Sequence, residues 1–154
     1  MAKELKAGDI MTTAVITVNP DDEVEKVARL LLEHHISGLP VVDEEGQLVG
    51  IITEGDLVFQ EKKIRAPLYT VILGGVIYLE KPQHFIDELK RAIARKVGEL
   101  MSTKLHTVGP DASVEDIATI MVERNINRVP VVDEDNKLIG IVSRQDIIRA
   151  THGK

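Results

Sequence analysis

The feature that most constrains this chain is an internal repeat with a period of 90 residues. Residues 10–58 align with residues 100–148 without a gap, and 20 of these 49 positions carry the same residue. The segment GIITEGD at 50–56 recurs as GIVSRQD at 140–146. Solenoid repeats recur every ~20–50 residues, so this longer period, with a segment between two copies, predicts a tandem duplication.

Each copy has the pattern β-α-β-β-α. In the first copy, the β-branched run at 15–18 predicts a strand, and helical spacing of apolar residues over 21–35 predicts a helix. Two strands follow at 39–43 and 47–53, and a second helix begins at 54. One such unit is too small to bury its own apolar face well. We therefore expect an α+β fold in which the two copies pack together.

The sequence divides into a first repeat at 1–60, an insert at 61–99 and a second repeat at 100–154. The insert contains an apolar run at 71–79 and then a predicted amphipathic helix that begins at Pro82, a residue suited to the first helical position. The apolar positions of that helix are Phe85, Ile86, Leu89, Ile93 and Val97. We expect a structured element here rather than a flexible linker.

Composition excludes several classes of function. The chain has no cysteine, so disulfides and thiolate metal sites are absent. Its longest apolar run is far shorter than the ~20 residues of a membrane helix, and its first residues lack a signal-peptide core. The net charge of −6 argues against nucleic acid as a partner. With no catalytic triad or metal-ligand spacing, we expect a cytoplasmic protein that is not an enzyme and needs no cofactor.

The repeated segment at 50–56 and 140–146 has two interpretations when its residues alone are considered. Thr53 with Asp56, and Ser143 with Asp146, have the spacing of a capping box, which needs no ligand. A helix N-terminus also attracts anions, and an aspartate beside it can accept hydrogen bonds from the two hydroxyls of a ribose. Both interpretations stay open at this point.

The pattern I-x-x-(L/V)-P-V-V-D followed by G-I-(I/V)-(T/S)-x-x-D, with IMTT or LMST upstream, resembles the CBS domain, and two copies resemble a Bateman module. The resemblance covers about two-thirds of the chain and omits 59–99. It implies two sheets packed about a pseudo-twofold axis, two equivalent clefts and a regulatory adenosine-ligand sensor. The implied ligand is AMP, ADP or ATP, with S-adenosylmethionine or NAD as alternatives. It also implies a homodimer and an unidentified regulated protein.

The resemblance assigns site residues position by position. It gives the ribose to Asp56 and Asp146, and neighbouring sugar or phosphate oxygens to Thr53 and Ser143. The remaining assigned positions are the first-strand threonines Thr17 and Thr107, and the residues before the proline, Ser37, Gly38, Asn127 and Arg128. Relatives often carry a basic residue before the proline, and only Arg128 keeps it here.

The two copies differ in charge. Lys104, His106, Arg128, Arg144 and Arg149 replace Ala14, Ile16, Gly38, Glu54 and Phe59 of the first copy. We therefore expect a phosphate tail to lie near Arg128 and Arg144. A second hypothesis is a protein scaffold with empty clefts, but an aspartate in both copies favours the sensor.

Overall fold

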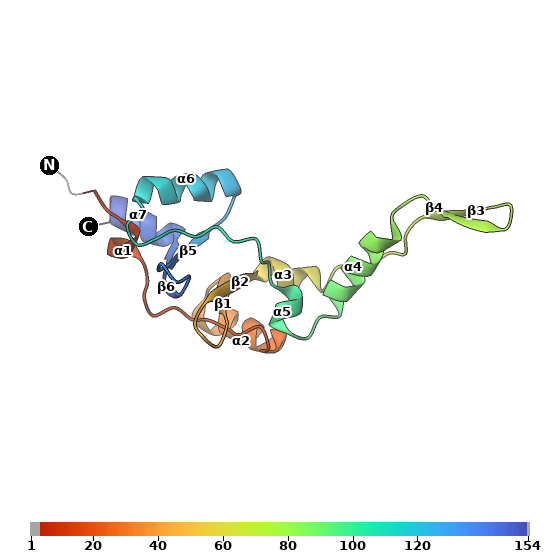
Figure 1. Cartoon of the computed structure of the whole chain (residues 1–154), viewed down its shortest axis with the longest axis horizontal. Coiled ribbons are helices and arrows are strands. Elements are labelled where there is room, and N and C mark those ends of the chain that lie inside the picture. The colour runs from red at the N-terminus through yellow and green to blue at the C-terminus, as the bar shows by residue number, and fades with distance from the viewer. Residues whose placement is uncertain (1–3, 154) are drawn as a thin grey trace.

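The computed structural model describes residues 4–153, which form short helices and three two-stranded antiparallel sheets (Figure 1). The first repeat contains α2 (Val24–His34), β1 (Gly38–Val42), β2 (Leu48–Thr53) and α3 (Glu54–Phe59). The second contains α6 (Val114–Arg124), β5 (Arg128–Val132), β6 (Leu138–Ser143) and α7 (Arg144–His152). The short helices α1 (Ala7–Ile10) and α5 (Val97–Leu100) precede the two repeats.

The two repeats share their local structure residue by residue. β1 pairs with β2 in the register Gly38–Thr53, and β5 pairs with β6 in the equivalent register Arg128–Ser143. Helices α2 and α6 end at His35 and Asn125, both in the left-handed region with φ of 52° and 53°. The α+β fold expected from the sequence is confirmed, including the helix over 24–34 and both strands.

The strand expected at 15–18 is wrong in its length. Only Val18 bridges β1, through its N–H to the carbonyl of Pro40 (3.2 Å) and its carbonyl to the N–H of Val42 (2.9 Å). Pro40 has no N–H to donate, so the ladder cannot continue past it. Val108 makes the same single bridge with Val131 in the second repeat.

A pseudo-twofold axis relates the repeats, and it is visible in reciprocal contacts. Gln47 bridges Lys137, its own counterpart 90 residues later, so the axis passes between them. The N–H of Leu48 donates to the carbonyl of Asn136 (3.1 Å), while the N–H of Leu138 donates to the carbonyl of Gly46 (3.2 Å). The two sheets are therefore joined at the axis by hydrogen bonds as well as by packing.

Each repeat completes the hydrophobic core of the other. Ala7 of α1 is buried in the core of the second repeat, together with Ile117, Val129 and others. Val97 and Leu100 of α5 are buried in the core of the first repeat. The leading helices are thus exchanged, which explains how two small units bury enough apolar surface to fold.

The insert projects from this body (Figure 1). It forms a hairpin of β3 (Tyr69–Ile72) and β4 (Gly75–Tyr78), followed by α4 (Pro82–Ala92). Pro82 lies at the start of α4 as expected. The predicted helix is wrong at its far end, because the chain leaves α4 after Ala92 and Val97 belongs to α5, where it enters the core.

Candidate functional site

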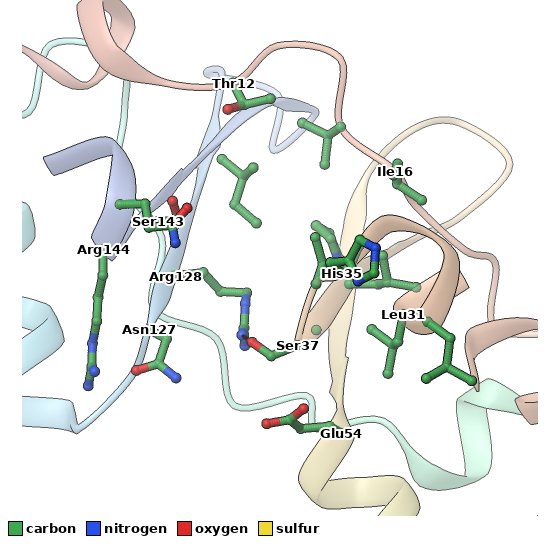
Figure 2. Close-up of a pocket in the computed structure, with 18 of the residues that line it drawn as sticks. Thr12, Ile16, Leu31, His35, Ser37, Glu54, Asn127, Arg128, Ser143 and Arg144 are labelled. Atoms are coloured by element: carbon green, nitrogen blue, oxygen red, sulfur yellow. Dashed lines mark hydrogen bonds between the residues drawn. The ribbon is translucent and has the colours of Figure 1, made fainter. Parts of the chain in front are cut away.

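Two clefts open between the repeats, and we name them after the aspartate that lines each. The Asp146 cleft has a volume of about 840 Å³, and the Asp56 cleft about 390 Å³. Both volumes lie in the range of small-molecule sites. In Figure 2, the Asp146 cleft has an apolar side formed by Ile16 and Leu31 and a polar side formed by Asn127, Ser143 and Arg144.

The clefts combine side chains from both copies, and they do so reciprocally. One wall of the Asp146 cleft is the segment with Thr12, Ala14 and Ile16 of the first copy. The Asp56 cleft takes the equivalent positions of the second copy, which are Ser102, Lys104 and His106. The first of these segments is largely apolar and the second carries basic groups, so the two clefts differ in the chemistry of this wall.

The pseudo-twofold arrangement divides the basic residues of the second copy between the clefts. Arg128 and Arg144, where we expect a phosphate tail, both line the Asp146 cleft, and Arg149 lines neither cleft. Lys104 and His106 line the Asp56 cleft, and Arg144 lines the Asp146 cleft. Arg128 lines both clefts.

Asp146 caps α7 and lines its cleft at the same time. One carboxylate oxygen, Oδ2, accepts hydrogen bonds from the backbone N–H of Ser143 (2.8 Å) and from its hydroxyl (3.0 Å). The other, Oδ1, accepts from Arg149 (3.3 Å). These bonds fix the orientation of the carboxylate, and the residue is only 6% exposed. The capping interpretation is therefore correct, and it does not remove Asp146 from the cleft wall.

Asp56 has the same arrangement with a different arginine. Its Oδ2 accepts from the N–H (2.9 Å) and hydroxyl (3.2 Å) of Thr53. Its Oδ1 accepts from Arg91, which comes from α4 in the insert (3.0 Å). The Arg91 guanidinium lies over the ring of Phe59, 4.3 Å from its centroid. Phe59 is the counterpart of Arg149, so the insert supplies the cation that the first repeat lacks.

Arg128 lies close to Gly38, its own counterpart across the axis. A Cβ atom at Gly38 would be 2.6 Å from a guanidinium nitrogen of Arg128. The guanidinium donates a hydrogen bond to the hydroxyl of Ser37, as Figure 2 shows. Burial lowers the pKa of Arg128, while the carboxylate of Glu54 acts in the opposite direction. The glycine therefore makes room for one shared arginine, which explains why the first copy has no basic residue here.

The structure brings together most, but not all, of the assigned residues. The clefts are lined by Ser37, Gly38, Thr53, Asp56, Asn127, Arg128, Ser143, Arg144 and Asp146. Thr17 lies outside the residues that line either cleft, and Thr107 lines a separate hollow with Val108 and Asp133. The neighbouring residues Ile16 and His106 line the clefts instead.

Several lining residues were not assigned from the sequence. Glu54 lines both clefts, and Thr12 and Ser102 line one each. Arg91 does not belong to either repeat, so the repeat pattern could not reveal it. Among residues 4–153, no group of three or more acids and histidines could hold a metal ion. No helix in that range is both long and apolar enough to cross a membrane.

The arrangement suits a nucleoside with an anionic substituent. The carboxylate of each aspartate can accept hydrogen bonds from sugar hydroxyls when these displace the arginine that donates to its Oδ1. The N-terminus of α7 and the guanidinium groups of Arg128 and Arg144 can bind negative oxygens. The apolar wall with Ile16 and Leu31 can contact a flat base.

Comparison with known proteins gives a consistent family. A model of the CBS domain matches residues 7–62 and 97–153. An uncharacterized protein of Methanocaldococcus jannaschii is 36% identical over 149 residues, which cover 92% of this chain and 88% of that protein. The chloroplastic CBS domain-containing protein CBSX2 of Arabidopsis thaliana is 33% identical over 147 residues, 93% of this chain and 62% of its own length.

Solved structures agree with the fold. CBSX2 in complex with AMP superposes with a TM-score of 0.74 at 29% identity, covering 95% of each chain. A CBS domain pair in complex with 5-methylthioadenosine and S-adenosyl-L-methionine superposes with a TM-score of 0.71 at 28% identity, covering 98% of each chain. In sequence, an inosine-5'-monophosphate dehydrogenase of Methanocaldococcus jannaschii is 31% identical over 144 residues, which cover 94% of this chain but only 23% of that protein.

Proposed function

The chain belongs to the CBS-domain family as a tandem pair, and we propose that it is a regulatory module that binds AMP, ADP or ATP between its repeats. One observation carries the proposal. In each repeat, an aspartate fixed by its neighbouring hydroxyl residue at a helix N-terminus lines an inter-repeat cleft. Relatives with this fold have been crystallised with AMP and with S-adenosyl-L-methionine, which both contain adenosine.

The Asp146 cleft is the first candidate for the nucleotide. It is the larger of the two, and Ile16 and Leu31 give it an apolar wall. Arg128 and Arg144 lie on the same cleft as Asp146, so ribose and phosphate contacts can form together. In the Asp56 cleft, Arg91 of the insert donates to the aspartate at 3.0 Å, a shorter contact than the 3.3 Å between Arg149 and Asp146.

S-adenosylmethionine is the second candidate, and Glu54 is the observation that favours it. Its carboxylate lines both clefts, at the position that Arg144 occupies in the other repeat. A carboxylate attracts the sulfonium and amine of that ligand and repels a polyphosphate. Competition calorimetry of S-adenosylmethionine against AMP, ADP and ATP distinguishes the two, because at least one of the three nucleotides must bind more tightly than S-adenosylmethionine if the nucleotide proposal is correct.

The aspartates provide the direct test. Asp56 and Asp146 are the N3 residues of their capping boxes. The Oδ1 of an asparagine there can still accept from the N-cap N–H, so Asp56→Asn and Asp146→Asn keep the size and this cap bond while removing the charge. A ligand at a hundred times its Kd stabilises the folded state by ~2.7 kcal/mol, which is roughly 5–10 °C of melting temperature for a chain of this size. We expect the double variant to lose most of this shift with AMP, while its ligand-free melting temperature falls by only a few degrees, because the substitutions also remove the charges that pair with Arg91 and Arg149. A full shift in the double variant would reduce these residues to helix caps.

The homodimer and the regulated protein expected from the sequence belong to the same proposal. The exposed apolar surface of residues 68–93 supports a protein contact outside the clefts. The residues that line the two clefts do not include any of 68–93, and this surface reaches the Asp56 cleft only through the hydrogen bond from Arg91 to Asp56.

A further inference from the structure

The insert carries most of the apolar surface that this chain exposes. Twelve of the sixteen exposed large apolar side chains in the described residues lie within 68–93, which we call the arm. The arm consists of the β3–β4 hairpin and α4, and Figure 1 shows it extending away from the two repeats. Contiguous apolar surface of this extent marks an interaction site on a protein.

The hairpin cannot account for its own stability. It has only two strands, and a two-stranded sheet needs a helix or further strands against it to persist in water. The register pairs Tyr69 with Tyr78 and Val71 with Val76, which places these four side chains on one face. All four are exposed, and the two tyrosine rings are in contact, with centroids 6.3 Å apart. This tyrosine face requires a covering element.

Helix α4 also exposes apolar side chains that no other element covers. It has no buried residue, although Ile86 and Leu89, with Ile93 directly after the end of the helix, form an apolar stripe at helical spacing. In Figure 1 the hairpin lies beyond one end of α4, so the two elements of one chain are arranged end to end. The tyrosine face and the α4 stripe of the same chain therefore leave each other uncovered.

We propose that the arm binds the arm of a second copy of this chain, side by side and in opposite directions. The tyrosine face of each hairpin then covers the α4 stripe of the other copy, in a twofold contact where each surface is used twice. This inference deepens the homodimer of the proposed function by assigning its interface, and it does not depend on which ligand the clefts bind.

Area and charge favour a second copy as the occupant. Seven side chains from each arm, at roughly 100 Å² apiece, give about 1,400 Å² of buried surface for the pair, within the ~1,200–2,000 Å² of stable interfaces. Residues 66–79 contain no charged side chain, so each hairpin can cover the helix of the other copy without like-charge repulsion. A lipid bilayer suits the hairpin less, because its outer strand edges carry unpaired N–H and C=O groups that hydrocarbon cannot satisfy.

Complementation between two charged variants tests this exchange. Val76→Lys places a cation on the tyrosine face, and Leu89→Glu places an anion on the α4 stripe; both positions are exposed, so each variant can fold. Each variant alone loses both hairpin–helix contacts of the dimer. In an equal mixture, one contact pairs lysine with glutamate and the other keeps its wild-type residues.

Sedimentation velocity on the full chain at tens of micromolar gives the readout. We expect wild type at twice the 17.0 kDa chain mass, each variant with a dimer dissociation constant raised at least tenfold, and recovery of the dimer in the mixture. Ile77→Lys, on the opposite hairpin face, and Val122→Lys, on α6, are matched controls that should change the constant less than threefold.

Three outcomes would overturn the proposal. A monomeric wild type excludes the dimer altogether. A mixture that stays monomeric shows that the hairpin packs on its own helix or on another partner. Loss of the dimer in Val122→Lys, but not in Val76→Lys or Leu89→Glu, assigns the contact to the helices of the repeats. That result refutes the arm as the interface but does not contradict the proposed homodimer or ligand binding.

Discussion

Replacing Arg91 with alanine should tighten ligand binding at the Asp56 cleft while it destabilises the free protein. Asp56 has both carboxylate oxygens engaged, Oδ2 by Thr53 and Oδ1 by Arg91. A ribose that takes two hydrogen bonds from this carboxylate must displace the guanidinium. Ligand and insert therefore compete for the same oxygen, and removal of Arg91 removes the competitor.

The magnitude follows from the exposure of the pair. The side chain of Asp56 is 18% exposed and that of Arg91 is 39% exposed, so solvent weakens their attraction. An ion pair of this kind contributes about 0.5–1 kcal/mol, which corresponds to roughly two- to fivefold in dissociation constant. The stacking of Arg91 on Phe59 adds about 0.5–1 kcal/mol to the stability of the free protein. We expect the melting temperature to fall by about 2–8 °C.

The assay isolates one cleft. In an Asp146→Asn background, isothermal titration with AMP reports on the Asp56 cleft. The dissociation constant of the Arg91→Ala protein is compared with that of the protein that keeps Arg91. Arg149→Ala in an Asp56→Asn background is the matched control. Arg149 is 70% exposed and its 3.3 Å contact lies within its own helix, so we expect a change below about twofold. Weaker binding of AMP to the Arg91→Ala protein would show that Arg91 prepares Asp56 for the ligand, which refutes the competition.

Three further predictions follow from packing and charge. Gly38→Ala places a Cβ atom 2.6 Å from the Arg128 guanidinium and must move it; calorimetry should show about tenfold weaker binding of AMP and unchanged binding of adenosine. Leu100→Ala should lower the free energy of unfolding by about 2–5 kcal/mol in urea titrations, because Leu100 is buried in the core of the first repeat. Asp22 accepts from the N–H of Asn19 (2.8 Å) and pairs with Lys26, and these contacts hold its pKa below the usual 3.8. Its stabilising contribution is present above that pH and lost as the pH falls through the lower folded-state pKa, so Asp22→Asn should lower the melting temperature at pH 6 more than at pH 3.

The sequence predicted the elements whose signal is local. Periodicity and start signals located α2, α4, the strands β1 and β2, and the helix that begins after Thr53. The capping box was also visible, because its two residues lie three positions apart. These features depend on neighbours along the chain, and one sequence is sufficient to infer them.

The features that the sequence missed depend on contacts between distant segments. Lys104 belongs to the second copy and Asp56 to the first, yet both line the Asp56 cleft. Only the pseudo-twofold arrangement brings these two side chains together. Arg91 reaches Asp56 from 35 positions away, through an insert with no counterpart in the repeat pattern. Helices α1 and α5 have four residues each, too few for periodicity to show which core they enter.

The exchange of α1 and α5 has a consequence for the origin of such a chain. Residues 97–153 alone contain one complete set of parts: a leading helix, a sheet and two further helices. In the intact chain, however, that leading helix is buried in the other repeat. Two separate half-length molecules could rebuild every reciprocal contact of the body by lending their leading helices to each other. A gene encoding one such molecule would need only duplication in tandem, with a spacer, to convert an association between two chains into the fold of one.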